Sequence, residues 1–562
     1  MTFALPSDGP VGRRWSTGVD ELADEGVKSA PALDERDAVP YGTRLGHLAE
    51  ELGQATAVTF VDVDGAEQAM TWHQLDIRSN QLAHVFADQG LGLGDRLAVS
   101  LPNSLDSLLA GFAGWKVGAT VVPVRWDLPE WERGRVLEVL DPTLTVGTDQ
   151  RELIRASVTA PDARLPEVTA PRASGVCSSG STGTPKVILQ KLPAVFLHST
   201  NVTSMVVADF GPVERPQLVL CPAPMYHTNG FTVFRTLLGG DPVVLLERFK
   251  APLVLDLIER HRITGFIAAT PMLQRLAQVP GIEDRDLSSL TWVQQGASPL
   301  PVWLGHRWIE LVGPERFYMS YGATEGFGIV VCRGDQWLAH PGTLGRGMSG
   351  TEIAVLSESG ERLPPGEIGG IYLRTPTGPM ASYVGNDVKP MDTTTDGFTS
   401  VGDLGWLDED GFLFMADRRV DMIVTGAVNV FPAEVEAALS GHPGIADVVV
   451  VGLRDPEWGR RVHAIVQRAD PTLEADGVIV FARERLAPYK VPKTVEFVDS
   501  IPRSEAMKFN RGALVEERDG PEPETGKGPE TEQPAGSESA PAVGPSGAAG
   551  AAGAAGAARA EV

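Results

Sequence analysis

The sequence predicts an α/β protein, with a large N-terminal domain and a small α+β domain after it. Between residues 41 and 320, short apolar runs alternate with amphipathic helical patterns, as in parallel sheets covered by helices. Beyond residue 342, short strand patterns separated by turns indicate an antiparallel β subdomain, and residues 421–515 mix strands with helices again. We therefore expect two α/β sheet subdomains and a β subdomain in the large domain.

The first part of the large domain alternates strands and helices. Residues 1–40 are polar and irregular, so we expect an arm or a loose tail there. The patterns then predict helices over 43–52, 71–89, 104–116 and 130–139, and strands over 57–63, 96–101, 120–124 and 144–147. This alternation indicates a parallel sheet, because parallel strands need crossover connections that are usually helical.

The next part continues the alternation and carries polar segments at its strand ends. The patterns predict helices over 194–207, 252–261 and 302–311, and strands over 217–221, 241–246, 265–269, 290–294 and 316–320. Several of these strands run directly into glycine-rich or polar segments. In open α/β sheets ligands bind at the carboxyl ends of the strands, so we expect the functional site at that edge.

The C-terminal part contains the β subdomain, the small domain and a tail. Strands are predicted over 352–356, 370–374, 412–417, 447–451 and 463–467, and helices over 433–439 and 477–485. From about residue 516 the chain is rich in Gly, Pro, Glu and Ala, which predicts a disordered tail. The expected divisions are 1–40, 41–417, 418–515 and 516–562.

Composition and charge narrow the class of protein. The chain has 562 residues and a net charge of −25, which argues against a nucleic-acid partner because phosphate backbones require basic surfaces. Cys177, Cys221 and Cys332 have no metal-ligand spacing, so we expect reduced, buried thiols. No apolar run approaches the ~20 residues of a membrane span, and the first ten residues lack a signal-peptide pattern. We therefore expect a soluble cytoplasmic protein.

One segment has the composition of an anion-binding loop. Residues Ser178–Lys186 read Ser-Ser-Gly-Ser-Thr-Gly-Thr-Pro-Lys, so consecutive amides and hydroxyls can point at a polyphosphate, and the lysine adds a point charge. The alternative is a flexible Ser/Thr/Gly linker, which the Val-Ile-Leu that follows disfavours. A Walker loop would need Gly-Lys-Ser/Thr. We interpret the segment as a nucleotide-phosphate loop of another type.

Other polar residues would complete a nucleotide-activating site. They are Thr324, Glu325, Asp403, Arg418 and Lys508. A phosphate loop, a carboxylate for Mg²⁺, an acid for a ribose and a mobile lysine are the parts that such a site needs. Each residue alone has an ordinary interpretation as a solvated charge or a turn residue, so the hypothesis rests on the set.

Together these motifs resemble those of adenylate-forming enzymes, which include acyl-CoA synthetases, aryl-CoA ligases, peptide-synthetase adenylation domains and beetle luciferases. They occur in the family order within residues 41–515, as Ser178–Lys186, Tyr226–Gly230, Tyr321–Glu325, Gly402-Asp403, Asp417-Arg418 and Gly426–Glu436. Within the family, the segment Asn-Val-Phe-Pro-Ala-Glu-Val-Glu at 429–436 is most similar to acyl- and aryl-CoA ligases.

The resemblance implies a reaction in two steps. A carboxylate attacks the α-phosphate of Mg·ATP to give an acyl-adenylate and pyrophosphate, and a thiol, usually coenzyme A, then displaces AMP. The cofactors implied are ATP and Mg²⁺, with CoA as co-substrate. Phe231–Phe234 stand where an amino-acid substrate usually calls for an acidic residue, which favours an apolar or aromatic acid. The oligomeric state is open, with a homodimer as one alternative. The family's small domain also rotates between the steps, so we expect a mobile C-terminal domain.

The resemblance implies a role for each matching residue. Phosphate contacts would come from Ser178, Ser181, Thr182 and Lys186, and adenine contacts from Gly296, Ala297, Ser298 and Tyr321. Asp403 would bind the ribose with Arg418 beside it, and Glu325 would bind Mg²⁺. Thr324 would donate to the α-phosphate or the acyl carbonyl, and Lys508 would bridge the carboxylate and the α-phosphate in the first step only. His227 would gate or flank the acyl pocket.

Three departures from the family pattern concern the second step. Val420 replaces an Asp or Lys, Ala427 replaces a glycine of a Gly-Gly pair, and Met507 replaces the glycine before the catalytic lysine. Glycine permits close backbone approach, so these residues alter the setting of Lys508 and of the thiol. A different acceptor stays an alternative: a carrier protein, an amine, or nitrite activated for an aryl amine as in the related ATP-dependent diazotases. A non-catalytic relative is disfavoured because the polar set is intact.

Overall fold

The computed structural model describes residues 38–178, 186–197, 205–211, 213, 215–348, 350–384, 391–400, 402–418, 421–425, 428–503 and 509–520. Six residues singled out from the sequence lie outside these ranges: Ser181, Thr182, Val420, Ala427, Met507 and Lys508. Within the ranges the chain is an α/β protein, as predicted.

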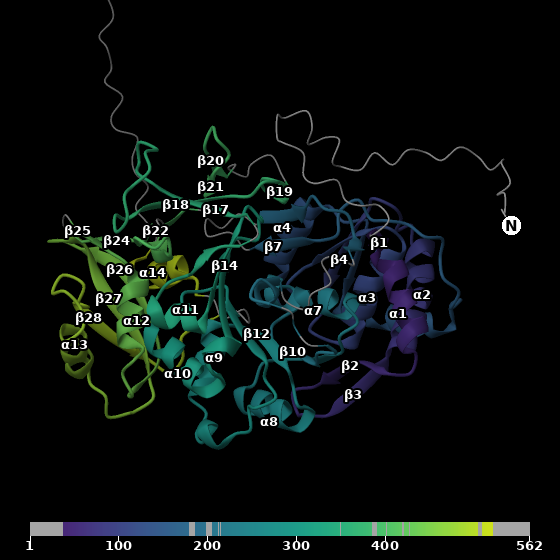
Figure 1. Ribbon diagram of the computed structural model, residues 1–562, viewed down its shortest axis with the longest axis horizontal. Helices are drawn as coiled ribbons and strands as arrows, with labels where there is room; N and C mark the ends of the chain where they lie inside the picture. Colours follow the sequence, from purple (N-terminus) through teal and green to yellow (C-terminus); the bar gives the residue numbers. More distant parts are fainter. Residues whose placement is uncertain are drawn as a thin grey trace, which may run out of the picture. The chain divides into compact units, whose positions relative to one another are not determined.

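The N-terminal part alternates strands and helices as expected. It consists of β1 (Ala38–Pro40), α1 (Tyr41–Leu52), β2 (Thr56–Val61), β3 (Glu67–Thr71), α2 (Trp72–Asp88), β4 (Arg96–Ser100), α3 (Leu105–Lys116), β5 (Thr120–Pro123), α4 (Glu130–Leu140), β6 (Leu144–Gly147) and α5 (Arg151–Ala156). The start of α2 is fixed by a capping box, in which Thr71 and Gln74 each accept a backbone hydrogen bond from the other. Helices α1, α2 and α3 lie side by side (Figure 1) and bury one apolar core.

A nine-stranded sheet forms the centre of the large domain. Its order is β16-β15-β14-β13-β12-β10-β11-β2-β3, and the run from β14 to β2 is parallel, with antiparallel strands at both edges. The strands are β10 (Val219–Cys221), β11 (Val243–Leu246), β12 (Gly265–Ala269), β13 (Trp292–Gly296), β14 (Phe317–Gly322), β15 (Ile329–Arg333) and β16 (Arg346–Gly347). The helices between them are α7 (Thr228–Leu238), α8 (Ala251–His261), α9 (Thr270–Ala277), α10 (Val302–Val312) and α11 (Gly334–Ala339).

Two smaller sheets belong to the second α/β subdomain. Strands β5, β4 and β6 are parallel. Strands β7 (Gly175–Ser178), β8 (Lys186–Gln190) and β19 (Ala381–Val384) are antiparallel, with β8 in the middle. A bridge between Val121 and Ser174 connects the two sheets. The segment that precedes the predicted phosphate loop is therefore one strand of a ladder, and Lys186 begins the next strand.

An antiparallel β subdomain and a separate C-terminal domain complete the fold. The β subdomain contains β17 (Glu352–Leu356), β18 (Gly369–Arg374), β20 (Asp392–Thr393), β21 (Thr399–Ser400), β22 (Asp403–Leu407) and β23 (Leu413–Arg418). The C-terminal domain contains β24 (Ile423–Thr425), β25 (Val428–Val430), α12 (Pro432–Leu439), β26 (Ile445–Asp455), β27 (Gly459–Arg468), α13 (Ala475–Arg483), β28 (Thr494–Val498) and α14 (Arg511–Asp519). Its five strands form one sheet with its own apolar core.

Two arginine–carboxylate pairs lie on either side of residues 504–508 in the C-terminal domain. Arg503 donates from Nε and Nη2 to the two carboxylate oxygens of Asp447, at 2.7 and 2.6 Å. Arg511 donates from Nη2 to both oxygens of Glu436, at 2.7 Å each. The guanidinium of Arg503 also lies 3.6 Å from the ring centroid of Phe509. The chain on both sides of 504–508 is therefore attached to the body of this domain.

The helix predicted over 194–207 is wrong for its first part. Val195–Leu197 form strand β9, which pairs antiparallel with β1, and among the described residues of this segment Met205–Ala208 form a short helix, α6. Pro193 precedes the strand, and Val and Phe favour extended backbone. The pairing partner is residues 38–40, which were expected to belong to an irregular arm. A local pattern could not reveal this distant partner.

The tail begins later than predicted. Helix α14 runs to Asp519, so the start of the tail at residue 516 is corrected. Leu514 is buried, and Arg518 donates to both carboxylate oxygens of Glu496 at 2.6 and 2.8 Å. These contacts attach the end of α14 to the domain, although the composition from about residue 516 predicted a disordered tail.

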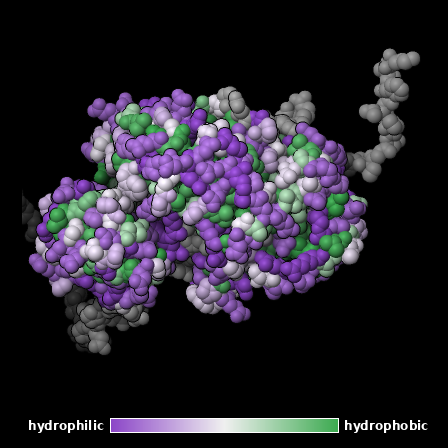
Figure 2. Space-filling view, turned by 90° about the horizontal axis from the view of Figure 1, so that it is seen from below, coloured by the Kyte–Doolittle hydropathy of each residue, from purple (hydrophilic) through white to green (hydrophobic). Residues whose placement is uncertain are grey.

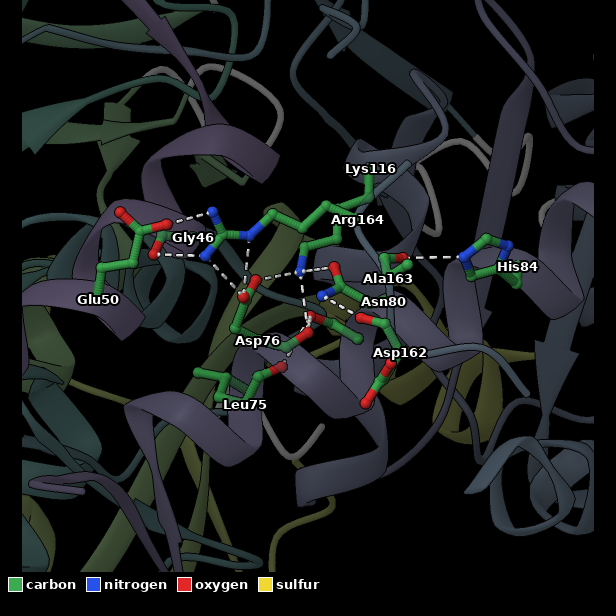
Figure 3. A network of polar contacts seen from close by, with 11 residues as sticks. Gly46, Glu50, Leu75, Asp76, Asn80, His84, Lys116, Asp162, Ala163 and Arg164 are labelled. Atoms are coloured by element: carbon green, nitrogen blue, oxygen red, sulfur yellow. Dashed lines mark hydrogen bonds and ion pairs between the residues drawn. The ribbon is translucent and has the colours of Figure 1, made fainter. Parts of the chain in front are cut away.

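A buried lysine joins the N-terminal helices (Figure 3). Lys116 Nζ donates to Asp76 Oδ1 at 2.6 Å and to Asn80 Oδ1 at 2.5 Å, and Arg164 Nη2 donates to Asp76 Oδ2 at 3.2 Å. The side chains of Lys116 and Asp76 are each 6% exposed. Burial lowers the pKa of Lys116 to about 8, although Asp76 raises it.

The surface carries no broad apolar area on the face shown in Figure 2. Hydrophilic residues predominate there, and hydrophobic residues are scattered in small groups. Among the described residues, no helix combines the length and the apolar character that crossing a bilayer requires.

Candidate active site

Four parallel strands deliver the predicted residues to one edge of the nine-stranded sheet. Strands β10, β12, β13 and β14 are neighbours. Beyond their carboxyl ends lie the loop to His227, the start of α9, the segment Gly296–Ser298 and the segment Tyr321–Glu325. Open α/β sheets bind ligands at this edge, so the topology brings these segments to the edge at which the sequence predicts the site.

The segment after β13 has an unusual backbone and a buried polar atom. Ala297 has φ of +72°, a left-handed conformation that costs energy for a residue with a Cβ. The Ser298 carbonyl accepts from Gln295 Nε2 at 2.5 Å and from Thr270 Oγ1 at 3.1 Å. Ser298 Oγ is buried and has no hydrogen-bond partner among the described residues. Buried hydroxyls usually have a hydrogen-bond partner in folded proteins, so Ser298 Oγ has the capacity to bond a further polar group.

Tyr321 and Asp403 form a second polar group. The Tyr321 hydroxyl donates to Asp403 Oδ2 at 2.7 Å, and Asp403 is only 4% exposed. Asp403 pairs with Arg418 in the register of β22 and β23. The structure thus brings together three residues to which the resemblance gives roles around the nucleoside, from two different sheets.

Glu325, Tyr383 and Lys186 form a third group. The Tyr383 hydroxyl donates to Glu325 Oε1 at 2.6 Å, and Lys186 Nζ lies 5.6 Å from the centroid of the Tyr383 ring. Burial and the neighbouring Glu325 raise the pKa of Tyr383 above its usual range. Sequence reasoning missed Tyr383, because it lies on β19, far along the chain from both residues that it contacts.

Two predicted catalytic residues take less constrained positions. Thr324 is exposed in the turn after β14. His227 is the N-cap residue of α7 without capping by its side chain, and its ring lies 5.8 Å from that of Tyr226. Ser178 ends β7, and Lys508 lies outside the described residues.

Two hollows adjoin α7. The first is lined by residues that include Cys221, Asn229, Val233, Ile267 and Trp292. The second is lined by residues that include Val99, Met225, Tyr226, Phe231 and Phe234. As far as described residues form them, neither lining contains a charged side chain.

The cysteines do not provide a nucleophile for this site. Burial raises the pKa of the thiols of Cys177, Cys221 and Cys332 to about 12. Thiols with such pKa values carry almost no thiolate near neutral pH. All three are free, as predicted.

The chain matches the AMP-binding enzyme family over residues 46–176 and 173–384, and the AMP-binding enzyme C-terminal domain over residues 434–508. The chain belongs to the AMP-binding enzyme family. This confirms the resemblance to adenylate-forming enzymes, and with acyl- and aryl-CoA ligases among its relatives the chain is an AMP-forming ligase.

Curated relatives include CoA ligases and a carrier-protein ligase. A feruloyl-CoA synthase from an Amycolatopsis species is 32% identical over 466 residues, which cover 79% of this chain and 93% of the relative. The fatty acid–[acyl-carrier-protein] ligase ScoC from Streptomyces coeruleorubidus is 30% identical over 476 residues, which cover 80% of this chain and 91% of the relative. Both relatives thus match over nearly their whole length.

Solved structures with the same fold include o-succinylbenzoate CoA synthetase from Bacillus subtilis. Its complex with the acyl-adenylate intermediate OSB-AMP has a TM-score of 0.71 at 28% identity, covering 86% of this chain and 99% of the other. The same enzyme in complex with ATP and magnesium ion has a TM-score of 0.69 at 26% identity, covering 84% and 98%. An adenylate-forming neighbour therefore holds both ATP and magnesium.

The residues of this chain fit a magnesium nucleotide. Glu325 presents a carboxylate of which Oε1 is used by Tyr383, and carboxylate oxygens are ligands that Mg²⁺ prefers. Lys186, which lies over the ring of Tyr383, provides a positive charge, and Asp403 provides a buried acceptor. Ser298 Oγ, which has no hydrogen-bond partner among the described residues, adds a hydroxyl that can hydrogen-bond to a polar edge of the ligand. The donors and acceptors thus correspond in kind to phosphate, metal, ribose and base.

Proposed function

We propose that this chain activates an aromatic or compact apolar carboxylic acid as its adenylate, using Mg·ATP, and transfers the acyl group to coenzyme A. The observation that carries the proposal is the arrangement of Lys186 at the start of β8, Glu325 in the turn after β14 and Asp403 at the start of β22. Tyr383 contacts both Lys186 and Glu325, and Tyr321 on β14 donates to Asp403. A cation, a metal ligand and a ribose acceptor are the minimum set for adenylation of a carboxylate.

The first step needs two anions to approach each other. When bound, Mg·ATP supplies an electrophilic α-phosphate and a pyrophosphate leaving group. Lys186 would offset charge on the phosphates, and Glu325 would hold the metal. Asp403, oriented by the Tyr321 hydroxyl at 2.7 Å, would bind the ribose hydroxyls. Thr324 and Lys508 would contact the reacting carboxylate and α-phosphate.

The acid is proposed to bind along α7, next to the first hollow. His227 stands at the N-terminus of this helix, and the uncharged lining supports an apolar acyl group. Phe231 and Phe234 line the second hollow, where they would support an aromatic ring. No carboxylate lines either hollow to pair with an amine, as far as the described residues form them.

Trp292 would limit the length of the acid. Its indole Nε1 donates to Gln217 Oε1 at 3.1 Å, and it packs against Gly265, where a Cβ would come within 2.1 Å of the ring. Residues two apart along a strand face the same side, so Trp292 and Gly296 share a face about 13 Å apart. The indole, held in place by these contacts, therefore forms the end of the acid pocket. A substituted aromatic ring is short enough to fit in front of it, and a long alkyl chain is not.

The acceptor is proposed to be coenzyme A. The matching relatives include CoA ligases, and ScoC, named as a carrier-protein ligase, makes a carrier-protein thiol the second candidate.

The free cysteines and the absence of a long apolar helix from the described residues support a proposed cytoplasmic location.

Pyrophosphate release tests the proposal. Purified protein is incubated with Mg·ATP and a panel of benzoates, cinnamates, and C8 and C16 fatty acids, with and without CoA, and separately with nitrite and an aryl amine. We expect release with aryl acids and a CoA thioester identified by mass spectrometry. Pyrophosphate release without a thioester, measured in the presence of CoA, would overturn coenzyme A as the acceptor. Pyrophosphate release with nitrite alone would overturn carboxylate activation.

A further inference from the structure

Tyr383 contacts both charged groups of the proposed phosphate and metal site. Its hydroxyl donates to Glu325 Oε1 at 2.6 Å, and its ring lies 5.6 Å from Lys186 Nζ. A different part of the tyrosine therefore contacts each charged group, the hydroxyl the carboxylate and the ring face the ammonium group. Such an arrangement is specific to tyrosine, since phenylalanine has no donor and serine has no ring face.

Backbone pairing fixes this geometry. Tyr383 lies on β19, which pairs with β8 so that Tyr383 is opposite Ile188 and Val384 is opposite Val187. Lys186 is the first residue of the same strand β8. The lysine and the tyrosine are therefore held on adjacent strands of one antiparallel ladder.

Glu325 comes from a different sheet. It lies in the turn after β14 of the nine-stranded sheet, and the Met380 amide donates to the Gly326 carbonyl at 3.2 Å next to it. The Tyr383–Glu325 hydrogen bond thus crosses from one sheet to the other. A hydrogen bond to a charged carboxylate is shorter and stronger than a neutral one, which agrees with the 2.6 Å distance.

We propose that Tyr383 is a positioning residue for adenylation: its hydroxyl orients the Glu325 carboxylate toward Mg²⁺, and its ring keeps the Lys186 ammonium away from that carboxylate. Opposite charges in a site of low dielectric attract strongly. Without a group between them, Lys186 and Glu325 would pair and neither would be available to phosphate or metal. Tyr383 contacts Lys186 and Glu325 separately, so both stay available to a bound magnesium nucleotide.

The inference rests on the proposed function, because it takes Glu325 as the metal ligand and Lys186 as the phosphate contact. Its first test is Tyr383→Phe, which removes only the hydroxyl. The matched control is Tyr372→Phe, since the Tyr372 hydroxyl also donates to a carboxylate at 2.6 Å, that of Asp392 on β20. Thermal unfolding of both variants checks that each folds as wild type does.

Direct metal binding is the readout. Mn²⁺ is titrated, with electron paramagnetic resonance detection, into protein saturated with α,β-methylene-ATP, and the Mg²⁺ dependence of pyrophosphate release is measured in parallel. We expect Tyr383→Phe to weaken Mn²⁺ binding about tenfold, the effect of losing a hydrogen bond to a charged group, and Tyr372→Phe to leave it unchanged. Equal Mn²⁺ affinity in wild type and Tyr383→Phe overturns the orienting role.

A second variant separates the ring from the hydroxyl. Tyr383→Leu removes both, so it should weaken Mn²⁺ binding at least as much as Tyr383→Phe does and in addition weaken binding of the nucleotide analogue measured without metal. Equal analogue affinity in the two variants overturns the role of the ring. A wild-type protein that binds no nucleotide-dependent Mn²⁺ and releases no pyrophosphate overturns the proposed function itself, an outcome distinct from a variant that behaves as wild type.

Discussion

Replacing Asp76 by Asn perturbs the polar network that joins α1, α2 and α3. In the wild-type chain burial lowers the pKa of Lys116 to about 8, against the opposing effect of Asp76. Removing the carboxylate leaves a buried ammonium without its counter-charge, which costs about 3 kcal/mol of unfolding free energy near pH 6. Lys116 then loses its proton at a lower pH than in wild type, because the raising effect of Asp76 is gone.

The effect of pH on this variant has a definite direction. The pKa of Lys116 in the folded chain lies below its ordinary value of 10.5, so the folded chain binds fewer protons between these values and stability rises with pH in that window. In Asp76→Asn the window opens at lower pH. The stability that the mutant has lost relative to wild type therefore becomes smaller as the pH rises towards 8. The total decrease is about 1.4 kcal/mol for each unit by which the mutation lowers the pKa of Lys116, and above pH 8 the difference stays constant.

Thermal unfolding of both proteins at pH 6 and pH 9 measures this difference. Tryptophan fluorescence reports on the relevant region, since Trp72 and Trp115 lie in the core formed by these helices. Asp286→Asn is the control, because Asp286 pairs with Arg262 where both side chains are more than half exposed and should leave the midpoint unchanged. A penalty that is equal at the two pH values, or larger at pH 9, would refute Lys116 as the titrating group.

Four further substitutions have expected outcomes. Asp403→Asn should raise the KM for ATP at least about tenfold, because the proposed charged acceptor for the ribose is lost, and unchanged ATP kinetics would contradict its proposed role. Ala297→Gly should stabilise the fold by about 1 kcal/mol by relieving the left-handed backbone, seen as a higher thermal midpoint. Trp292→Leu should shift pyrophosphate release toward longer acids in the panel, and an unchanged acid profile would remove it as the end of the acid pocket. Lys508→Ala should abolish adenylation while reverse thiolation is less affected, and equal loss of both half-reactions would count against its proposed position.

Local patterns predicted most of the large domain because its strands and helices are adjacent in sequence. The capping residues Thr71 and Ser104 stood where the helix patterns begin, and the structure starts α2 and α3 directly after them. Helix α7 was missed because its first residues form a Thr-Asn-Gly segment typical of a turn. Tertiary packing of Val233, Phe234 and Leu237 stabilises it instead.

Features that depend on distant partners were not predictable in the same way. Strand β9 needs β1, about 157 positions earlier in the chain by the pairing of Ala38 with Leu197 and Val195 with Pro40. Tyr383 needs Glu325 and Lys186, which come from other strands. The sequence motifs identified the charged members of the site, whereas the neutral side chain between them became visible only when the two sheets were placed together.

The two arginine–carboxylate pairs beside residues 504–508 have a consequence for how the enzyme commits to its first half-reaction. Lys508 is covalently next to Phe509, on whose ring the Arg503 guanidinium lies, so the proposed catalytic lysine is one peptide bond from a residue that is attached to the C-terminal domain. In the proposed role of Lys508, delivery of the lysine would then depend on one conformational equilibrium, the orientation of the C-terminal domain. A ligand that binds one domain orientation more tightly must shift the population towards that orientation. By linkage, holding the domain in that orientation must raise the affinity for the ligand by the same factor.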